Sequence, residues 1–265
     1  MVNIEENIIL KTEKLSIGYQ QKKQNIVVAS AINLSLEKGK LITVLGKNGI
    51  GKSTFLRTIA NVQKPLSGAV FIKKQLIQNY ENIEFAKLVS MVLTERLPES
   101  QLTVFELIAT GRQPYTNWID SLTKEDIEKI NWAIEQTGIQ HLKHKRFYEL
   151  SDGQLQHVLI ARALAQDTPI IILDEPTAHL DLHNTIKIIQ LLKDLVHKTG
   201  KTIIMSSHQV NLSIQLADEI ILFKDKNIVK GIPSKLIEEG AFDDLFSSKI
   251  IYFNKEVQQF IVNTK

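Results

Sequence analysis

The stretch Gly46-Lys47-Asn48-Gly49-Ile50-Gly51-Lys52-Ser53-Thr54 decides the fold of this chain. It follows the apolar run 41–45 and precedes the helix-like segment 55–60, so a strand leads through a glycine-rich loop into a helix. In that setting the pattern G-x-x-x-x-G-K-[ST] predicts a phosphate-binding loop, because glycines let backbone amides surround an anion at a helix N-terminus. Lys52 is expected to bridge the β- and γ-phosphates, and Ser53 to ligate Mg²⁺. The chain is therefore predicted to bind a nucleoside triphosphate.

Composition narrows the class of protein. The 265 residues are 43% hydrophobic and 23% charged, which is typical of a globular protein with a large core. A net charge of only +3 gives no support to a nucleic-acid partner. The absence of cysteine excludes disulfides and thiolate metal sites. The polar start and the lack of an apolar run near about 20 residues predict a cytoplasmic protein that reaches a membrane only through a partner.

The order of patterns predicts an α/β fold with a mainly parallel sheet, preceded by N-terminal antiparallel strands and interrupted by a helical insertion. Strands are expected at 8–17, 27–36, 41–45, 69–72 (after a Ser67–Gly68 turn), 170–173 and 202–206. The segment between about 102 and 148 has a helical pattern, with Thr123 as the N-cap of one helix and Thr137–Gly138 at its end. Further helices are expected at 155–166 and 184–198, and a hairpin around Asn254–Lys255.

Two carboxylates follow the buried strand 170–173. Ligands gather at the carboxyl ends of parallel strands, so Asp174 is placed to hold Mg²⁺ directly or through water. Glu175, one residue later, is placed to accept a proton from an attacking water. Surface acids at a strand end are common, and it is the phosphate loop upstream that favours the catalytic interpretation.

Four more segments accompany the loop and these carboxylates in a characteristic order: Gly18–Tyr19, Leu150-Ser151-Asp152-Gly153-Gln154, Pro176-Thr177-Ala178-His179-Leu180-Asp181 and Ser206-Ser207-His208. With them, essentially the whole chain resembles the ATP-binding-cassette (ABC) ATPases, the motor subunits of ABC transporters. The resemblance implies a P-loop NTPase core and ATP hydrolysis with Mg²⁺. It also implies a single ABC ATPase domain over 1–265, with a helical subdomain inserted at approximately 95–165.

The resemblance also assigns roles to single residues. Tyr19 corresponds to the aromatic residue that stacks on adenine, although a core aromatic is the alternative. His208 corresponds to the switch histidine, which contacts the γ-phosphate and helps align the water with Glu175. The signature residues Ser151, Gly153 and Gln154 imply a grip on ATP held by a second subunit, and Asp181 lies in the D-loop of that dimer. A plain N-cap is the structural alternative for Ser151, and both roles are compatible.

Two positions depart from the family pattern. Asp152 stands where the signature usually has glycine, and we expect its carboxylate to point away from the γ-phosphate, because like charges repel. The glutamine of the family's Q-loop, which touches Mg²⁺ and the water, should follow the strand 88–93. Thr94 is expected at that position, where its hydroxyl can ligate Mg²⁺; Glu95 takes its place if the register slips by one residue.

The segment 102–115 discriminates within the family. Its pattern Val-x-Glu-Leu-x-x-x-Gly-Arg-x-Pro-Tyr resembles the ATPases of ferric-siderophore, haem and cobalamin importers, in which this region receives a membrane permease. Gly111 and Pro114 are expected to end the helix 104–110, and a plain helix-end turn is the alternative. The implied partners are a second copy of the chain, a permease on the inner face of the cell membrane and, indirectly, a substrate-binding protein. A non-transport ABC ATPase of the iron–sulfur assembly type and an exporter subunit remain the rival interpretations.

Overall fold

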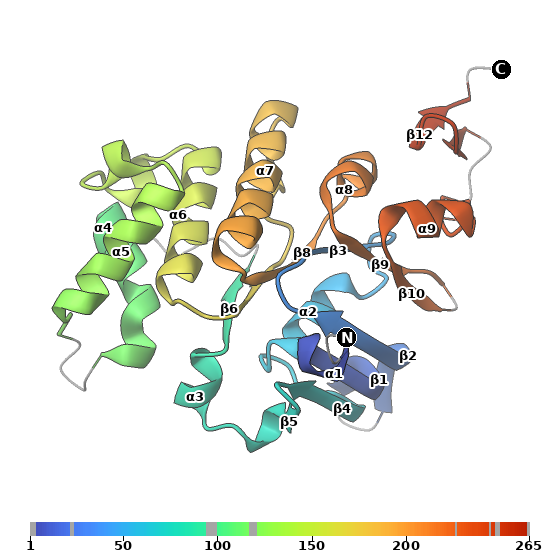
Figure 1. Ribbon diagram of the computed structural model, residues 1–265, viewed down its shortest axis with the longest axis horizontal. Coiled ribbons are helices and arrows are strands. Elements are labelled where there is room, and N and C mark those ends of the chain that lie inside the picture. Colours follow the sequence, from blue (N-terminus) through green and yellow to red (C-terminus); the bar gives the residue numbers. More distant parts are fainter. Residues whose placement is uncertain are drawn as a thin grey trace. The chain divides into compact units, whose positions relative to one another are not determined.

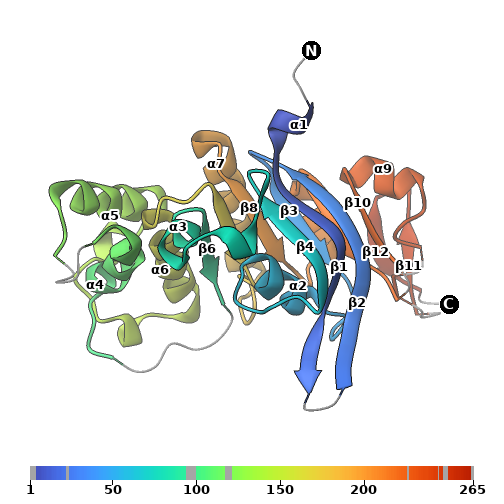
Figure 2. The same ribbon diagram turned by 90° about the horizontal axis from the view of Figure 1, so that it is seen from below.

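The computed structural model describes residues 4–21, 24–93, 100–116, 121–225, 227–243, 245–246 and 250–263. The chain forms two compact units, which are described separately below. The first unit combines Met1–Asn79 with Thr202–Lys265, and the second is Tyr80–Lys201. Figures 1 and 2 show the elements of both from two directions.

The first unit contains an antiparallel sheet with the strand order β2-β1-β4-β5. Its elements are α1 (Ile4–Asn7), β1 (Ile8–Gln21), β2 (Gln24–Glu37), β4 (Ser67–Ile72), β5 (Gln75–Leu76) and the 3₁₀ turn η1 (Ile77–Asn79). The strands β1 and β2 form a long hairpin, which is seen along its length in Figure 2. Leu10, Leu15 and Ile17 lie on the buried face of β1. Leu10 and Leu15 are an odd number of positions apart, and the register shift between Thr12 and Leu15 brings them to the same face.

The first unit also contains four strands in the order β10-β9-β3-β8. The strands are β3 (Leu41–Leu45), β8 (Thr202–Ser206), β9 (Glu219–Phe223) and β10 (Ile228–Gly231). Both β8 and β9 run parallel to β3, and β10 is antiparallel to β9. Every residue of β3, β8 and β9 is buried, which explains their nearly continuous apolar sequences. The remaining elements are α2 (Lys52–Ile59), α8 (Val210–Leu216), α9 (Pro233–Glu238), β11 (Ile251–Asn254) and β12 (Gln259–Val262).

The second unit pairs two parallel strands with several helices. The strands are β6 (Val89–Val92) and β7 (Ile170–Leu173), which are hydrogen-bonded along their length. The helices are α3 (Asn82–Ala86), α4 (Val104–Ala109), α5 (Lys124–Gln136), α6 (Asp152–Ala165) and α7 (Leu182–Thr199), with the 3₁₀ segments η2 (Thr110–Tyr115), η3 (Gln140–Leu142) and η4 (Phe147–Glu149). The helices α4, α5 and α6 pack on one another (Figure 1).

The predicted α/β fold class is confirmed, and the strands predicted at 41–45, 170–173 and 202–206 have the observed bounds. Thr123 caps α5 with its hydroxyl, as predicted, and Gly138 follows the helix in the left-handed conformation. The C-terminal hairpin is also confirmed.

One local prediction was wrong. The strand expected at 69–72 starts at Ser67, so the predicted Ser67–Gly68 turn is part of β4. The helix predicted at 104–110 is confirmed within one residue, because α4 ends at Ala109; the tighter 3₁₀ segment η2 follows it and includes Pro114.

Candidate functional site

The phosphate loop of the first unit runs from the end of β3 to the start of α2. Gly46 has φ +152°, and a Cβ there would lie 2.8 Å from the carbonyl oxygen of Phe223. Gly51 has φ +111°, and its Cβ would lie 2.4 Å from a methyl carbon of Val28. Any side chain at either position would force the loop away from its neighbours. These two glycines are therefore required by contacts with β9 and β2 as well as by backbone conformation.

Lys52 is almost fully buried, with 4% of its surface exposed. Its ammonium group donates hydrogen bonds to the carbonyl oxygens of Gly46 (2.9 Å) and Lys47 (3.1 Å), so the side chain folds back across the loop. Gly51, at the N-cap of α2, has no side chain that could cap the first amides of the helix. A cation and helix amides therefore lie at the same loop, which is the arrangement that binds phosphate.

Tyr19 and Thr54 connect the hairpin of β1 and β2 to the loop. The Tyr19 hydroxyl lies 3.0 Å from Thr54 Oγ1, and half of the tyrosine surface is exposed. Thr54 itself is buried, whereas Ser53 is partly exposed beside it. The exposed part of the tyrosine leaves it able to stack on a ligand.

His208 lies at the same end of the sheet as the phosphate loop. The strands β3 and β8 run in parallel with Val44 opposite Ser206, and the amide of Ser207 donates to the carbonyl of Val44 (3.1 Å). His208 follows directly and its side chain is exposed. The structure thus places His208, the predicted switch histidine, at the same end of the sheet as the loop, and places Tyr19 beside the loop.

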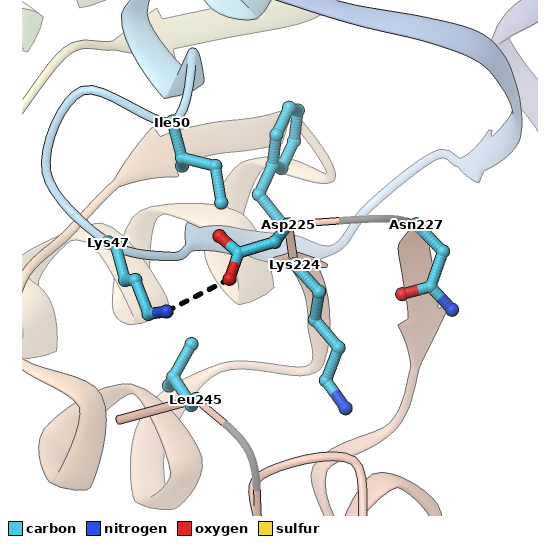
Figure 3. A pocket seen from close by; sticks show the side chains of 7 residues that line it. Lys47, Ile50, Lys224, Asp225, Asn227 and Leu245 are labelled. Atoms are coloured by element: carbon cyan, nitrogen blue, oxygen red, sulfur yellow. Dashed lines mark hydrogen bonds and ion pairs between the residues drawn. The ribbon is translucent and has the colours of Figure 1, made fainter. Parts of the chain in front are cut away.

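A pocket of about 480 Å³ adjoins the phosphate loop on the side of β9 (Figure 3). It is lined by Lys47, Ile50, Phe223, Lys224, Asp225, Asn227 and Leu245. Lys47 points across it and forms an ion pair with Asp225, with 3.1 Å between Nζ and Oδ2. The side chain of Lys47 is therefore directed towards the turn between β9 and β10. This ion pair could not be predicted from a local pattern, because its partners are 178 residues apart.

The second unit carries the two carboxylates. Asp174 is buried at the end of β7, and its amide donates to the carbonyl of Val92 on β6 (2.9 Å). Glu175 has φ +49°, a left-handed conformation that is unfavourable for a residue with a side chain. Such strain is concentrated at functional sites, because it persists only where the surrounding structure maintains it. The carboxylate of Asp174, like the hydroxyl of Ser53 in the first unit, offers the hard oxygen ligand that Mg²⁺ prefers.

The signature residues cap α6. The hydroxyl of Ser151 accepts from the Gln154 amide (3.3 Å), and the Gln154 side chain accepts from the Ser151 amide (3.1 Å). This reciprocal capping box is the structural role considered for Ser151. An added Cβ at Gly153 would lie 3.6 Å from the side chain of Asn184, an ordinary contact. Asp181 in turn caps α7, where its carboxylate accepts two hydrogen bonds from Asn184 (2.8 and 2.9 Å).

Arg112 has an interior position that the sequence did not reveal. It is 3% exposed; its Nε donates to Asp126 (2.8 Å), and its Nη1 donates to the Ala165 carbonyl at the end of α6 (2.8 Å). Tyr115 lies over the guanidinium carbon, with 3.9 Å to the ring centroid. Burial raises the pKa of Asp126, but hydrogen bonds from Thr123 and Arg112 outweigh it and hold the pKa below its usual value.

The neighbouring Gly111 has no room for a side chain, because a Cβ there would lie 2.4 Å from the carbonyl oxygen of Arg162. Most of the Gly-Arg-x-Pro-Tyr pattern is therefore explained by packing within the second unit.

Thr94 and Glu95, the Q-loop candidates, lie outside the described residues. Within the described ranges, no group of three or more histidine, cysteine or acidic residues forms a metal cluster, and no helix is long and apolar enough to cross a membrane.

Comparisons with known proteins agree with this geometry. Residues 29–178, more than half of the chain, match the family model described as ABC transporter. The chain is 38% identical to the iron(3+)-hydroxamate import ATP-binding protein of Bacillus subtilis (strain 168), over 83% of this chain and 81% of that protein. It is 31% identical to the ferric enterobactin transport ATP-binding protein of Escherichia coli (strain K12), over 94% and 90%.

A solved ATP-binding cassette, described as dimeric, in a post-hydrolysis state and bound to ADP and phosphate, superposes with a TM-score of 0.73. It is 27% identical, and the match covers 85% of this chain and 99% of that one. The family match agrees with the glycine-rich loop, its buried lysine and the paired carboxylates. We conclude that the chain belongs to the ABC transporter family, as an ATP-binding and ATP-hydrolysing subunit.

Proposed function

We propose that this chain hydrolyses ATP to drive the import of an iron chelate of the siderophore class through a separate membrane permease. The observation that carries the proposal is the match, over most of both chains, with subunits that import iron(3+)-hydroxamate and transport ferric enterobactin. These matches favour iron chelates over haem and cobalamin. They also favour an importer over an exporter or a non-transport ATPase.

Nucleotide binding is assigned to the first unit. The amides of the loop 46–54 enclose the phosphates, and Lys52 exchanges its two backbone carbonyl partners for the β- and γ-phosphate oxygens. The Tyr19 ring stacks on the adenine from its position beside Thr54. Lys47 contributes its backbone amide to the loop, while its side chain holds the loop to Asp225.

Hydrolysis is assigned to Glu175 and His208. Glu175 accepts the proton of the attacking water as a general base, and His208 contacts the γ-phosphate and keeps that water aligned. Ser53 and Asp174 would hold Mg²⁺, with Thr94 as the further ligand expected from the sequence. When bound, Mg²⁺ neutralises the charge that develops on the transferred phosphoryl group.

The active assembly is proposed to be a homodimer. Ser151, Gly153 and Gln154 at the N-terminus of α6 contact the γ-phosphate held by the second copy, and Asp181 lies at the dimer contact. In the capping box the Ser151 hydroxyl and the Gln154 side-chain carbonyl only accept hydrogen bonds, so the Ser151 O–H and the Gln154 side-chain NH₂ can still donate to the γ-phosphate of the partner's ATP. One chain alone thus holds half of each site.

We place the protein in the cytoplasm, attached to the inner face of the cell membrane through the permease, with a substrate-binding protein as an indirect partner and no nucleic acid. The fold is proposed as one ABC ATPase domain over 1–265 with the helical subdomain at approximately 95–165. Helices α4, α5 and α6, which lie within that range, are the candidates for contact with the permease.

The test is reconstitution of the chain and its permease in proteoliposomes with the substrate-binding protein outside. Ferric hydroxamate bound to that protein should stimulate ATP hydrolysis, whereas haem and cobalamin should leave the basal rate unchanged. Stimulation by haem or cobalamin alone would refute the iron-chelate assignment while leaving the ATPase assignment intact.

A further inference from the structure

The C-terminal hairpin is bonded to the helix that follows the switch histidine. Asn211, in the first turn of α8, donates from Nδ2 to the carbonyl oxygen of Phe260 (3.3 Å). The amide of Phe260 donates back to Asn211 Oδ1 (2.9 Å). One side-chain amide therefore satisfies both backbone groups of Phe260 on the edge of β12, as a neighbouring strand would.

Apolar contacts join the same two elements. Val210 and Ile214 of α8 are buried in a cluster with Phe242 and Phe253, and Phe260 packs against it. The rings of Phe253 and Phe260 lie 5.1 Å apart, and those of Phe242 and Phe253 lie 5.2 Å apart. Leu45, the residue before the phosphate loop, belongs to this cluster too. The hairpin thus packs into the core that supports both the loop and α8.

The helix α8 depends on such contacts for its position. It has 7 residues, fewer than the roughly 12–15 that a helix needs to be stable in water by itself. Its N-cap Gln209 provides no side-chain cap. The turn before it is short: the amide of Gln209 donates to Ser207 Oγ (3.0 Å) and the amide of Val210 to the carbonyl of His208 (3.1 Å). Where α8 begins therefore determines where His208 lies.

We propose that Asn211 is a positioning residue, through which the C-terminal hairpin fixes the start of α8 and with it the turn that carries His208. The inference rests on the role proposed above for His208. A group that is displaced by about 1 Å from its productive place loses much of its effect on rate while ATP binding persists. Asn211 therefore acts on turnover, and ATP affinity is set by the loop and Tyr19.

The test compares the full-length Asn211→Ala variant with the parent protein. We expect the turnover number to fall by about 10-fold or more, with ATP affinity within about twofold of the parent. Asn211→Asp keeps the acceptor for the Phe260 amide and loses the donor, so its turnover should be intermediate. Asn33→Ala is the matched control, because Asn33 also bonds two backbone groups, the Lys14 amide and the Ala31 carbonyl, in the N-terminal sheet. This control should keep the turnover of the parent.

A double-mutant cycle shows whether Asn211 acts through His208. In a His208→Ala background, Asn211→Ala should cause no further loss of turnover. In an otherwise unchanged chain it should speed deuterium exchange at the amides of 207–210. An additional loss in the His208→Ala background, or a fall in ATP affinity as large as the fall in turnover, would overturn the positioning role.

Two outcomes separate this inference from the function on which it rests. If His208→Ala turns over ATP like the parent, the assigned role of His208 fails and the positioning role fails with it. If His208→Ala is impaired while both Asn211 variants match the parent, only the positioning role fails.

Discussion

The Tyr19 hydroxyl and Thr54 Oγ1 lie 3.0 Å apart, although the residues are 35 positions apart in the chain. This hydrogen bond joins the hairpin of β1 and β2 to the first turn of α2, directly after the phosphate loop. It keeps the half-exposed ring of Tyr19 beside the loop. The ring of Tyr19 and the amides of the loop, the two parts of the proposed nucleotide site, are therefore held in place relative to each other.

Separate substitutions distinguish the two roles of Tyr19. Tyr19→Ala removes a stacking surface that is worth about 1–3 kcal/mol per base, so ATP affinity should fall by roughly 5- to 100-fold. Tyr19→Phe keeps the ring and loses only the bond to Thr54, so its affinity should stay within a few-fold of the parent. Isothermal titration with ATP measures both. Parent-like binding by Tyr19→Ala would remove the residue from the nucleotide site.

Lys52→Ala should weaken ATP binding itself, because it deletes the buried cation of the loop. Charge-assisted hydrogen bonds contribute about 1.5–3 kcal/mol, which corresponds to a loss of roughly 10- to 100-fold in affinity. Lys47→Ala is the matched control, since that lysine also lies in the loop but points towards Asp225. Equal affinities of Lys52→Ala and Lys47→Ala would contradict the assignment of Lys52 to the phosphates.

Arg112→Met should destabilise the protein by about 3–5 kcal/mol, because it removes the cation that pairs with the buried carboxylate of Asp126 and leaves only the hydrogen bonds from Thr123. Chemical denaturation measures the change in free energy of unfolding. The double variant Arg112→Met/Asp126→Leu is the control, as it removes both charges and should recover much of the loss. A single variant as stable as the parent would show that the ion pair contributes nothing to the second unit.

Thr94→Ala tests the proposed Q-loop position. We expect it to reduce permease-stimulated hydrolysis more than basal hydrolysis, with little change in ATP affinity, because the Q-loop lies between the chemistry and the permease in the family. Both rates are measured, with the isolated chain and with the reconstituted transporter. Glu95→Ala is the control for register: if it alone is impaired, Glu95 takes the role, and if neither variant is impaired, the segment has been misassigned.

The sequence predicted most accurately what depends on short, buried patterns. The strands β3, β7 and β8 are short, fully buried and mostly apolar, so their sequences alone indicate buried strands. Thr123 was predicted as an N-cap because a threonine followed three residues later by an acid identifies a helix start locally. The buried run of β9 has the same kind of pattern, but it was not predicted, although Glu219–Phe223 offered the signal.

Contacts between distant residues could not be predicted. Nothing in the local pattern identifies Asp126 as the partner of Arg112, because the two residues are 14 positions apart and lie on different elements of the second unit. Asn211 and Phe260 are 49 residues apart, and nothing in either local pattern indicates a bond. The left-handed conformation of Glu175 also could not be predicted from the sequence, because a residue before a proline usually has an extended backbone.

The central claim is that the chain hydrolyses ATP as a dimer with Glu175 as the general base, and Glu175→Gln tests it most directly. The measurement is steady-state hydrolysis together with size-exclusion chromatography in ATP and Mg²⁺. General-base assistance contributes about 10²- to 10⁴-fold, so turnover should fall by at least that lower factor while ATP binding persists. The variant should then elute as an ATP-bound dimer, and the parent protein as a monomer. A Glu175→Gln variant that hydrolyses ATP near the parent rate and stays monomeric in ATP would contradict the account.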